Sequence, residues 1–229
     1  MKKKITFSTE LSYIFGLIFL AVGTAFMEAS NFGVSMIVAP AYILHLKISE
    51  YLPFFSFGMA EYTLQAVLLI LLIIVLRRFK VSYLFSFVTA IVYGFILDGS
   101  MMLVGLLPCN TILTRVIFWI IGFIVCAVGV SLLFHTYISP EVYELFVKEF
   151  SSKFGTDIHK TKTVYDCISL VVSVILSFVF FGLWQFRGVS SGTLVAAVFN
   201  GLTIGCAAKL LERFFEFKDT LGLRHFFEK

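Results

Sequence analysis

Charged residues are scarce in this sequence of 229 residues, where they make up 14% of the chain. Hydrophobic residues account for 59%, and the mean hydropathy is +0.98. Soluble domains carry about 25% charged residues, so this composition lies well outside soluble usage. Apolar segments take up almost all of the length and leave no room for a separate soluble domain. The composition therefore predicts one transmembrane domain over residues 1–229.

Catalytic motifs are also missing. The sequence contains no H-E-x-x-H motif, no paired acidic protease motif and no phosphate-binding loop. Residues 188–192 fit the loose G-x-S-x-G pattern, which needs a strand-turn-helix setting and a histidine base. Ser190 is better explained as the cap of a helix. None of the four histidines lies in that loop, and three are predicted on the opposite side of the membrane: His135, His159 and His225. We predict that the protein is not an enzyme and has no cofactor.

Cysteine is rare and scattered. Three of the four cysteines fall inside apolar segments, and their spacing matches neither a metal site nor a disulfide framework. Apolar packing is the expected role of all four, and no metal site is predicted. The cysteines are Cys109, Cys126, Cys167 and Cys206.

What the sequence does contain is long apolar segments. A helix needs about 20 mainly apolar residues to cross a membrane. Six segments meet or approach that length, so the predicted fold class is all-α, a polytopic protein of six transmembrane helices. The basic start of the chain is not followed by a signal-peptide cleavage site, so the first helix is expected to be retained. The predicted spans are 11–29, 57–76, 83–103, 115–135, 164–183 and 192–211.

Lysines and arginines gather on one side of this six-span topology. Three lie on the other side: Lys47, Arg115 and Arg187. The remaining cations are Lys2, Lys3, Lys4, Arg77, Arg78, Lys80, Lys148, Lys153, Lys160, Lys162, Lys209, Arg213, Lys218, Arg224 and Lys229. Cytoplasmic loops carry the excess of positive charge, so both termini are expected in the cytoplasm of a bacterial plasma membrane. The net charge of +4 is then a topology signal, and no nucleic-acid partner is expected.

Two short segments follow the first and fourth spans. After Gly33 breaks the chain, Ser35 is expected to cap a short apolar helix over 36–46, interrupted by Pro40. Residues 141–154 have apolar side chains on one side, which predicts an amphipathic helix. Each segment is either re-entrant or interfacial. The tail over 214–229 mixes phenylalanines with charges and is expected to lie at the cytoplasmic membrane surface.

The chain also contains an internal repeat. G-L-I-F-L-A-V-G at 16–23 recurs as G-F-I-V-C-A-V-G at 122–129, with five identical positions of eight. Glu61 and Asp166 stand about 105 positions apart, in matching places of the second and fifth spans. Two repeats follow, about 11–107 and 115–213. Because each repeat has three helices, the second copy must enter the membrane from the opposite side, which is the inverted architecture of many transporters.

Small residues on the repeated helices are predicted to bring the helices close together. The predicted helix-packing positions are Gly16, Ala21, Gly23, Ala25, Gly94, Gly122, Gly129 and Gly201.

Polar side chains within the spans are candidates for a solute or ion pathway, since ionisable groups in a bilayer are costly. Glu28, Glu61 and Asp98 fall in the outer third of the first three helices and are predicted to meet in an outward cavity. The alternative is that they lie at the headgroup boundary. Asp166 is the inward counterpart of Glu61, or else an interfacial cap. The candidate pathway residues are Glu28, Glu61, Gln65, Asp98, Asp166 and Asn200.

Several short motifs resemble those of YczE/YitT-type bacterial membrane proteins. They are A-S-N-F-G-V-S at 29–35, R-R-F-K at 77–80, the stretch 94–98, and S-G-T-L-V-A-A-V-F-N-G at 191–201. The resemblance implies a multi-helix plasma-membrane protein of bacterial source without an established substrate. It implies the shorter, YczE-like form, which lacks a soluble C-terminal domain.

The leading hypothesis is a transporter or channel-like protein for a small solute or ion, working by alternating access. One alternative is a non-transporting scaffold that assists a partner protein. Another is a substrate-binding S component of a vitamin transporter, which the alanine ridge at positions 21, 25 and 29 resembles. Expected partners are the lipid bilayer, a small solute or ion, and a second copy or partner membrane protein.

Overall fold

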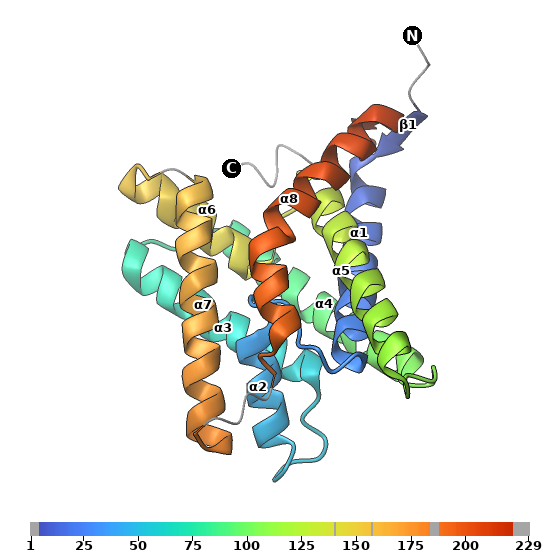
Figure 1. The fold of residues 1–229 in the computed structure, drawn as a ribbon. Helices are drawn as coiled ribbons and strands as arrows, with labels where there is room; N and C mark the ends of the chain where they lie inside the picture. The colour runs from blue at the N-terminus through green and yellow to red at the C-terminus, as the bar shows by residue number, and fades with distance from the viewer. Residues whose placement is uncertain (1–4, 140, 157, 184–187, 222–229) are drawn as a thin grey trace.

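The computed structural model describes residues 5–139, 141–156, 158–183 and 188–221 (Figure 1). Pro140, Arg187, the first four residues and the tail beyond 221 lie outside the described residues. The elements are β1 (Ile5–Ser8), α1 (Thr9–Ala29), α2 (Ala39–Ile48), α3 (Phe57–Leu76), α4 (Val81–Val104), α5 (Ile112–Phe134), α6 (Val142–Phe154), α7 (Ile158–Phe181), α8 (Ser191–Phe214) and β2 (Phe215–Lys218).

Six helices are long and apolar enough to cross a membrane: α1, α3, α4, α5, α7 and α8. The predicted all-helical protein with six spans is therefore confirmed. The largest difference is at α7, which begins at Ile158 and not near 164. Asp166 consequently lies two turns inside the helix. Its alternative interpretation as a cap was wrong.

Two small-residue contacts join α1 and α5 at the centre of the fold. A Cβ atom on Gly23 would lie 2.7 Å from the carbonyl oxygen of Gly122, and one on Gly16 would lie 3.1 Å from that of Gly129. The two helices therefore run antiparallel with their backbones in direct contact, which larger side chains would prevent. Ala21 and Ala25, from the same predicted set, are fully buried nearby.

The two ends of the described chain lie together at one end of the bundle (Figure 1). β1 pairs in parallel with β2, with Ile5 opposite Phe215 and Ser8 opposite Lys218. The carboxylate of Glu10 accepts hydrogen bonds from Tyr137 Oη (2.8 Å) and from the backbone N–H of Leu221 (2.9 Å). No strand was predicted in this chain. Residues 215–218, at the start of the tail predicted over 214–229, instead form β2 and pair with β1.

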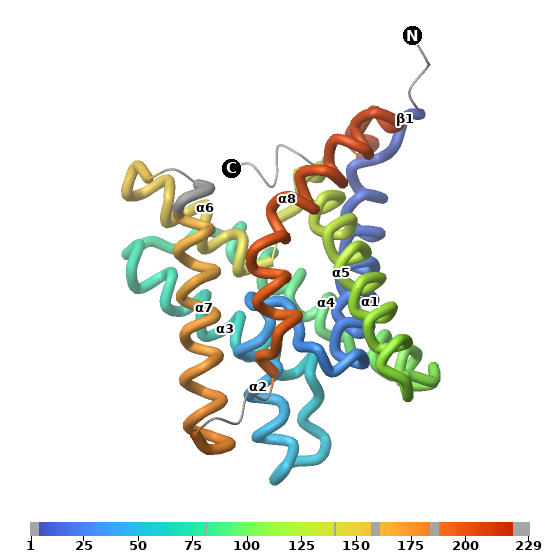
Figure 2. Tube along the Cα trace, in the orientation of Figure 1, coloured from blue at the N-terminus to red at the C-terminus, as the bar shows by residue number. Residues whose placement is uncertain are grey.

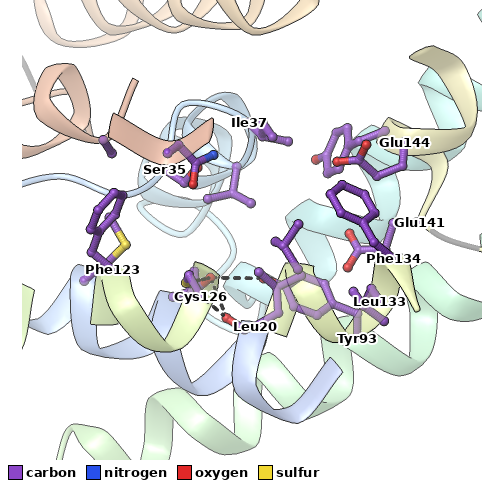
Figure 3. A pocket seen from close by; sticks show the side chains of 17 residues that line it. Leu20, Ser35, Ile37, Tyr93, Phe123, Cys126, Leu133, Phe134, Glu141 and Glu144 are labelled. Carbon is purple, nitrogen blue, oxygen red and sulfur yellow. Dashed lines mark hydrogen bonds between the residues drawn. The ribbon is translucent and has the colours of Figure 1, made fainter. Parts of the chain in front are cut away.

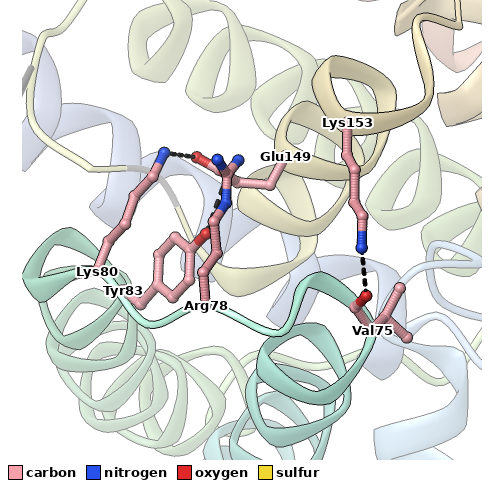
Figure 4. Close-up of polar contacts among 6 residues, drawn as sticks. All are labelled: Val75, Arg78, Lys80, Tyr83, Glu149 and Lys153. Carbon is pink, nitrogen blue, oxygen red and sulfur yellow. Dashed lines mark hydrogen bonds and ion pairs between the residues drawn. The ribbon is translucent and has the colours of Figure 1, made fainter.

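The helix α6 packs against α3, α4 and α7. Figure 4 shows Glu149 on α6 accepting from Arg78 (2.8 Å), Lys80 (2.7 Å) and Tyr83 (3.0 Å), which come from the α3–α4 connection and the start of α4. Burial alone would raise the pKa of Glu149, but the hydrogen bonds from Lys80, Tyr83 and Arg78 outweigh it and lower this pKa. Lys153 adds a bond to the carbonyl of Val75 (2.5 Å).

The short helix α2 starts later than predicted. Its N-cap is Val38, which makes no side-chain cap, and Pro40 lies in the first turn. The predictions that Ser35 caps this helix and that Pro40 interrupts it were wrong, because proline suits the first turn, where its missing N–H costs nothing. Ser190 does occupy the N-cap of α8, as predicted.

Helix contacts in the first half largely recur in the second. α1 packs on α4 as α5 packs on α8, and α2 on α3 as α6 on α7. α3 also packs on α6 as α7 packs on α2. Two contacts are not repeated among the described residues. α3 lies firmly against α4, whereas α7 and α8 make no comparable contact, and α4 packs on α6 without a comparable contact of α8 with α2. Figure 2 shows α7 and α8 running apart along the bundle.

Candidate functional site

Two buried carboxylates meet where α3 contacts the start of α6. Glu61 accepts a hydrogen bond from Tyr143 Oη (2.8 Å), and Glu141 accepts one from the side-chain amide of Gln65 (3.0 Å). The amide oxygen of Gln65 accepts from the backbone N–H of Val142 (3.0 Å). Gln65 thus joins the two carboxylates through its amide group.

Each of these carboxylates keeps one free oxygen. In the described part of the chain, Oε1 of Glu61 and Oε1 of Glu141 are buried and have no hydrogen-bond partner. Glu141 precedes the first turn of α6, as the sequence suggested, but its side chain does not cap that helix. Burial is the main cause that raises the pKa of Glu141 to about 8, helped by Glu144 and opposed by Gln65 and Lys162.

A cavity of about 70 Å³ lies beside Glu141. Its wall comes from α1, α4, α5, α6, α8 and the loop before α2 (Figure 3). Most of this wall is apolar or aromatic, including Tyr93, Phe123 and Phe134. The polar residues of the lining are Thr24, Ser35, Tyr93, Glu141, Tyr143, Glu144 and Asn200, with Cys126 beside Thr24.

A second, more open space lies between α7 and α8. This groove has a volume of about 380 Å³ and is lined by Lys162, Asp166, Asn200 and Gly201, among others. Lys162 pairs with Glu144 (2.7 Å), which belongs to the cavity, and approaches Asp166 (3.9 Å). Asn200 lines both spaces. The ion pair of Lys162 with Glu144 and the amide of Asn200 therefore stand between groove and cavity.

The loop over residues 32–38 closes the opposite side of the cavity. Thr193 on α8 donates to the carbonyl of Val34 (2.8 Å), and Trp119 on α5 donates to that of Gly33 (3.2 Å). Gly33 has φ of +94°, a conformation that favours glycine. Beyond this loop lies a further groove of about 310 Å³, which contains Glu28. Ser35 and Val38 line the cavity, while Gly33 and Val34 line this groove, so the loop lies between the two spaces.

The three acids predicted to meet in one outward cavity lie at three different places. Glu28 accepts from Tyr42 Oη on α2 (2.9 Å). Asp98 accepts from the backbone N–H of Gly58 (2.8 Å) and the hydroxyl of Ser56 (2.5 Å) and thereby caps the start of α3. Glu61 faces Gln65 and α6 instead. The single outward cavity was therefore a wrong prediction, because the three carboxylates bond to different neighbours.

Among the remaining predicted residues, Gln65 donates a hydrogen bond to the buried carboxylate of Glu61 (3.5 Å), and Asp166 and Asn200 both line the α7–α8 groove. Gly94 lies at the α3–α4 contact, where its Cβ would be 2.8 Å from the carbonyl of Gly58. Gly201 makes no close helix contact in this arrangement: a Cβ there would meet no atom within 4 Å. The packing role predicted for it is absent because α7 and α8 run apart.

Sequence reasoning missed Glu141 and Tyr143 as site residues. Both stand at the start of a segment with an amphipathic pattern, which was interpreted as lying on the membrane. The available signal was the number of polar residues in α6, of which Tyr143, Glu149 and Ser151 are buried. Polar groups at buried positions indicate contact with other polar groups and not with lipid.

Residues 7–209 match the model of a family of unknown function, DUF6198. The chain belongs to DUF6198. No curated protein and no solved structure matches it. Membership of DUF6198 therefore adds no substrate or partner, and the functional argument for this family member depends on its own residues.

Proposed function

We propose that the protein is a transporter for a small solute, built from two inverted three-helix repeats that open alternately to the two sides of a bacterial plasma membrane. The observation that carries this proposal is the difference between two equivalent helix pairs. α3 and α4 are closed on each other, while α7 and α8 are apart and border a groove that contains Lys162, Asp166 and Asn200. An alternating-access transporter is open to one side of the membrane while it is closed to the other. One helix pair is therefore expected to be closed while its counterpart is open.

The glycine contacts between α1 and α5 support the repeat. Adding 106, the difference between 16 and 122, converts Gly16 and Gly23 into Gly122 and Gly129. Exchanging each glycine for its counterpart turns the Gly16–Gly129 contact into the Gly122–Gly23 contact, which is the other contact observed. Contacts that exchange in this way are typical of a two-fold axis. We place this axis between α1 and α5.

The proposed pathway runs through the three spaces described above. A solute would enter the α7–α8 groove from the cytoplasmic side, where we place both termini because of the cation distribution. It would pass Asn200 and the Lys162–Glu144 pair to reach the cavity. The loop over 32–38 would close the outer side in this state. In the opposite state, α7 and α8 would close and the outer groove at Glu28 would join the cavity.

Cysteine cross-linking tests this proposal. Thr163 and Gly201 border the open groove and correspond in the repeat to the region of Gly58 and Gly94, which touch. In a background without native cysteines, T163C with G201C is expected to form a disulfide in part of the molecules in membranes. In a disulfide the two Cβ atoms lie about 3.8 Å apart, whereas a Cβ on Gly201 meets no atom within 4 Å in the open arrangement. Absence of any cross-link, with a Ser56→Cys and Asp98→Cys pair oxidising readily, would contradict alternation.

A second candidate is a scaffold whose α7 and α8 hold a partner membrane protein. Its specific support is burial: 17% of the span Thr161–Phe181 and 11% of Ser191–Phe214 are buried, against 50% for α1. A partner helix in the groove would cover Lys162 and Asp166. Cross-linking of groove cysteines to another chain, with no T163C–G201C disulfide, is the result that favours this scaffold. The resemblance to YczE/YitT-type proteins fits either function and is itself a proposal.

A further inference from the structure

The carboxylates around the cavity outnumber their cationic partners. Glu61, Glu141, Glu144 and Asp166 lie close to it or to the groove, and Lys162 is the one cation that pairs with any of them within the described part of the chain. Glu61 and Glu141 have no ion-pair partner there and each has a buried oxygen without a hydrogen bond. Buried ionised carboxylates are costly unless a positive charge or a proton neutralises them. The site therefore favours a proton or, in its place, a positively charged occupant.

Glu141 is the carboxylate best placed to hold that occupant. Its side chain lines the cavity, whereas Glu144 is already paired with Lys162 and Glu61 is not part of the lining. Glu141 is only 6% exposed, and its free oxygen has no protein donor among the described residues. Figure 3 shows the Glu141 side chain in the wall of the cavity, near Phe134 and Tyr93.

The rest of the lining does not suit a metal ion. Hard cations such as calcium take six to eight oxygen ligands, and magnesium binds through near-ideal octahedral oxygen geometry. The described residues contain no group of three metal-ligating side chains, and the cavity wall is mainly carbon. An organic ammonium needs fewer acceptors and gains from apolar and aromatic neighbours, since aromatic faces attract cations.

We propose that this cavity binds a small organic ammonium ion, whose N–H groups donate to the carboxylate of Glu141 and whose carbon atoms contact Tyr93, Phe123 and Phe134. The inference rests on the proposed transport function and names its substrate class. The volume of about 70 Å³ sets the size. It is about half that of an engineered 150 Å³ cavity that admits benzene, so the occupant has only a few non-hydrogen atoms. Asn200 supplies a further polar contact at the groove side.

The test uses ethylammonium as the probe and the full-length protein in detergent. Calorimetric titration and thermal unfolding are measured with ethylammonium chloride, with potassium chloride at the same ionic strength, and with ethanol as a neutral analogue of the same size. Glu141→Gln removes the charge, and Ala196→Leu fills the cavity from a buried position on α8 without changing any charge. Glu50→Gln is the control, because Glu50 pairs with Lys47 on an exposed surface.

We expect saturable binding of ethylammonium, weakened about tenfold or more by E141Q and by A196L and unchanged by E50Q. The use of two variants guards against one that fails to fold. No binding by folded wild-type protein up to about 10 mM overturns the proposal, as does equal binding of ethanol or binding that survives E141Q. If binding fails while T163C and G201C still cross-link, the transporter stands and the ammonium class falls. If ethylammonium binds and no cross-link forms, the site stands and alternation falls.

Discussion

The α3–α4 and α7–α8 helix pairs hold equivalent positions in the two halves of the chain but differ in contact. Gly58 and Gly94 bring α3 and α4 so close that a Cβ on Gly58 would lie 2.1 Å from the carbonyl of Gly94. The counterpart of Gly94 is Gly201, which has open space around it. Small residues thus permit close helix contact without enforcing it. The second pair retains the counterpart of Gly94 but has Thr163 in the place of Gly58, and the first pair shows the closed geometry.

Substituting Gly58 in the closed pair and Gly201 in the open pair gives the largest expected difference between the halves. Gly58→Leu would force the α3 and α4 backbones apart and should lower the free energy of unfolding by about 3 kcal/mol or more. Gly201→Leu meets no neighbour in the open groove and should change it by less than about 1 kcal/mol, since replacing a helical glycine is favourable in itself. Denaturant unfolding in detergent measures both. Equal losses would show that α7 and α8 are also closed in solution.

A smaller effect is expected where α6 contacts α3. Tyr143→Phe deletes the hydrogen bond to Oε2 of Glu61 and leaves that buried oxygen with only the longer bond from Gln65 (3.5 Å), at a cost of about 1–3 kcal/mol. Glu61→Gln together with Tyr143→Phe completes a double-mutant cycle that isolates the pair. Strictly additive effects in this cycle would contradict the contact. The mirrored interface of α7 with α2 is left untouched and serves as the internal reference.

The remaining expected effects are pH-dependent and have opposite signs within α6. The pKa of Glu141 is raised to about 8, so the folded state holds the proton more tightly, and this stability is lost as pH rises from about 4.3 to 8. The pKa of Glu149 is lowered, so its stability is present above about 4.3 and lost as pH falls through the folded value. We expect the melting temperature of wild-type protein to fall by a few degrees toward high pH because of Glu141 and toward low pH because of Glu149. E141Q should remove the fall toward high pH, and E149Q should remove the fall toward low pH. Parallel curves for both variants would reject this assignment.

Much of the fold could be predicted because hydrophobic length and glycine spacing are local signals. The span 57–76 agrees with α3 at both ends, and the repeated octets at 16–23 and 122–129 do lie at one helix contact. The β1–β2 pair could not be predicted, since it joins Phe7 to Phe217 across the whole chain. Nothing near either strand in sequence indicates its partner.

The candidate site was predicted only in part. Glu61, Gln65, Asp166 and Asn200 stood out because polar groups in apolar spans are unusual. Their separation into a buried pair and a groove depends on how α6 enters between α3 and α7, which no periodicity encodes. Glu141 escaped notice because a carboxylate before a helix usually interacts with the helix dipole at the surface. Here tertiary contact with Gln65 decides its position.

The most direct test of the central claim is the distance between α7 and α8 in a lipid membrane. Spin labels on T163C and G201C, in a background without native cysteines, report this distance by pulsed electron resonance. The account predicts two populations, one long, as in the open groove, and one short, as between Gly58 and Gly94, with proportions that change when ethylammonium is added. A single long distance, unchanged by any addition, would contradict alternating access.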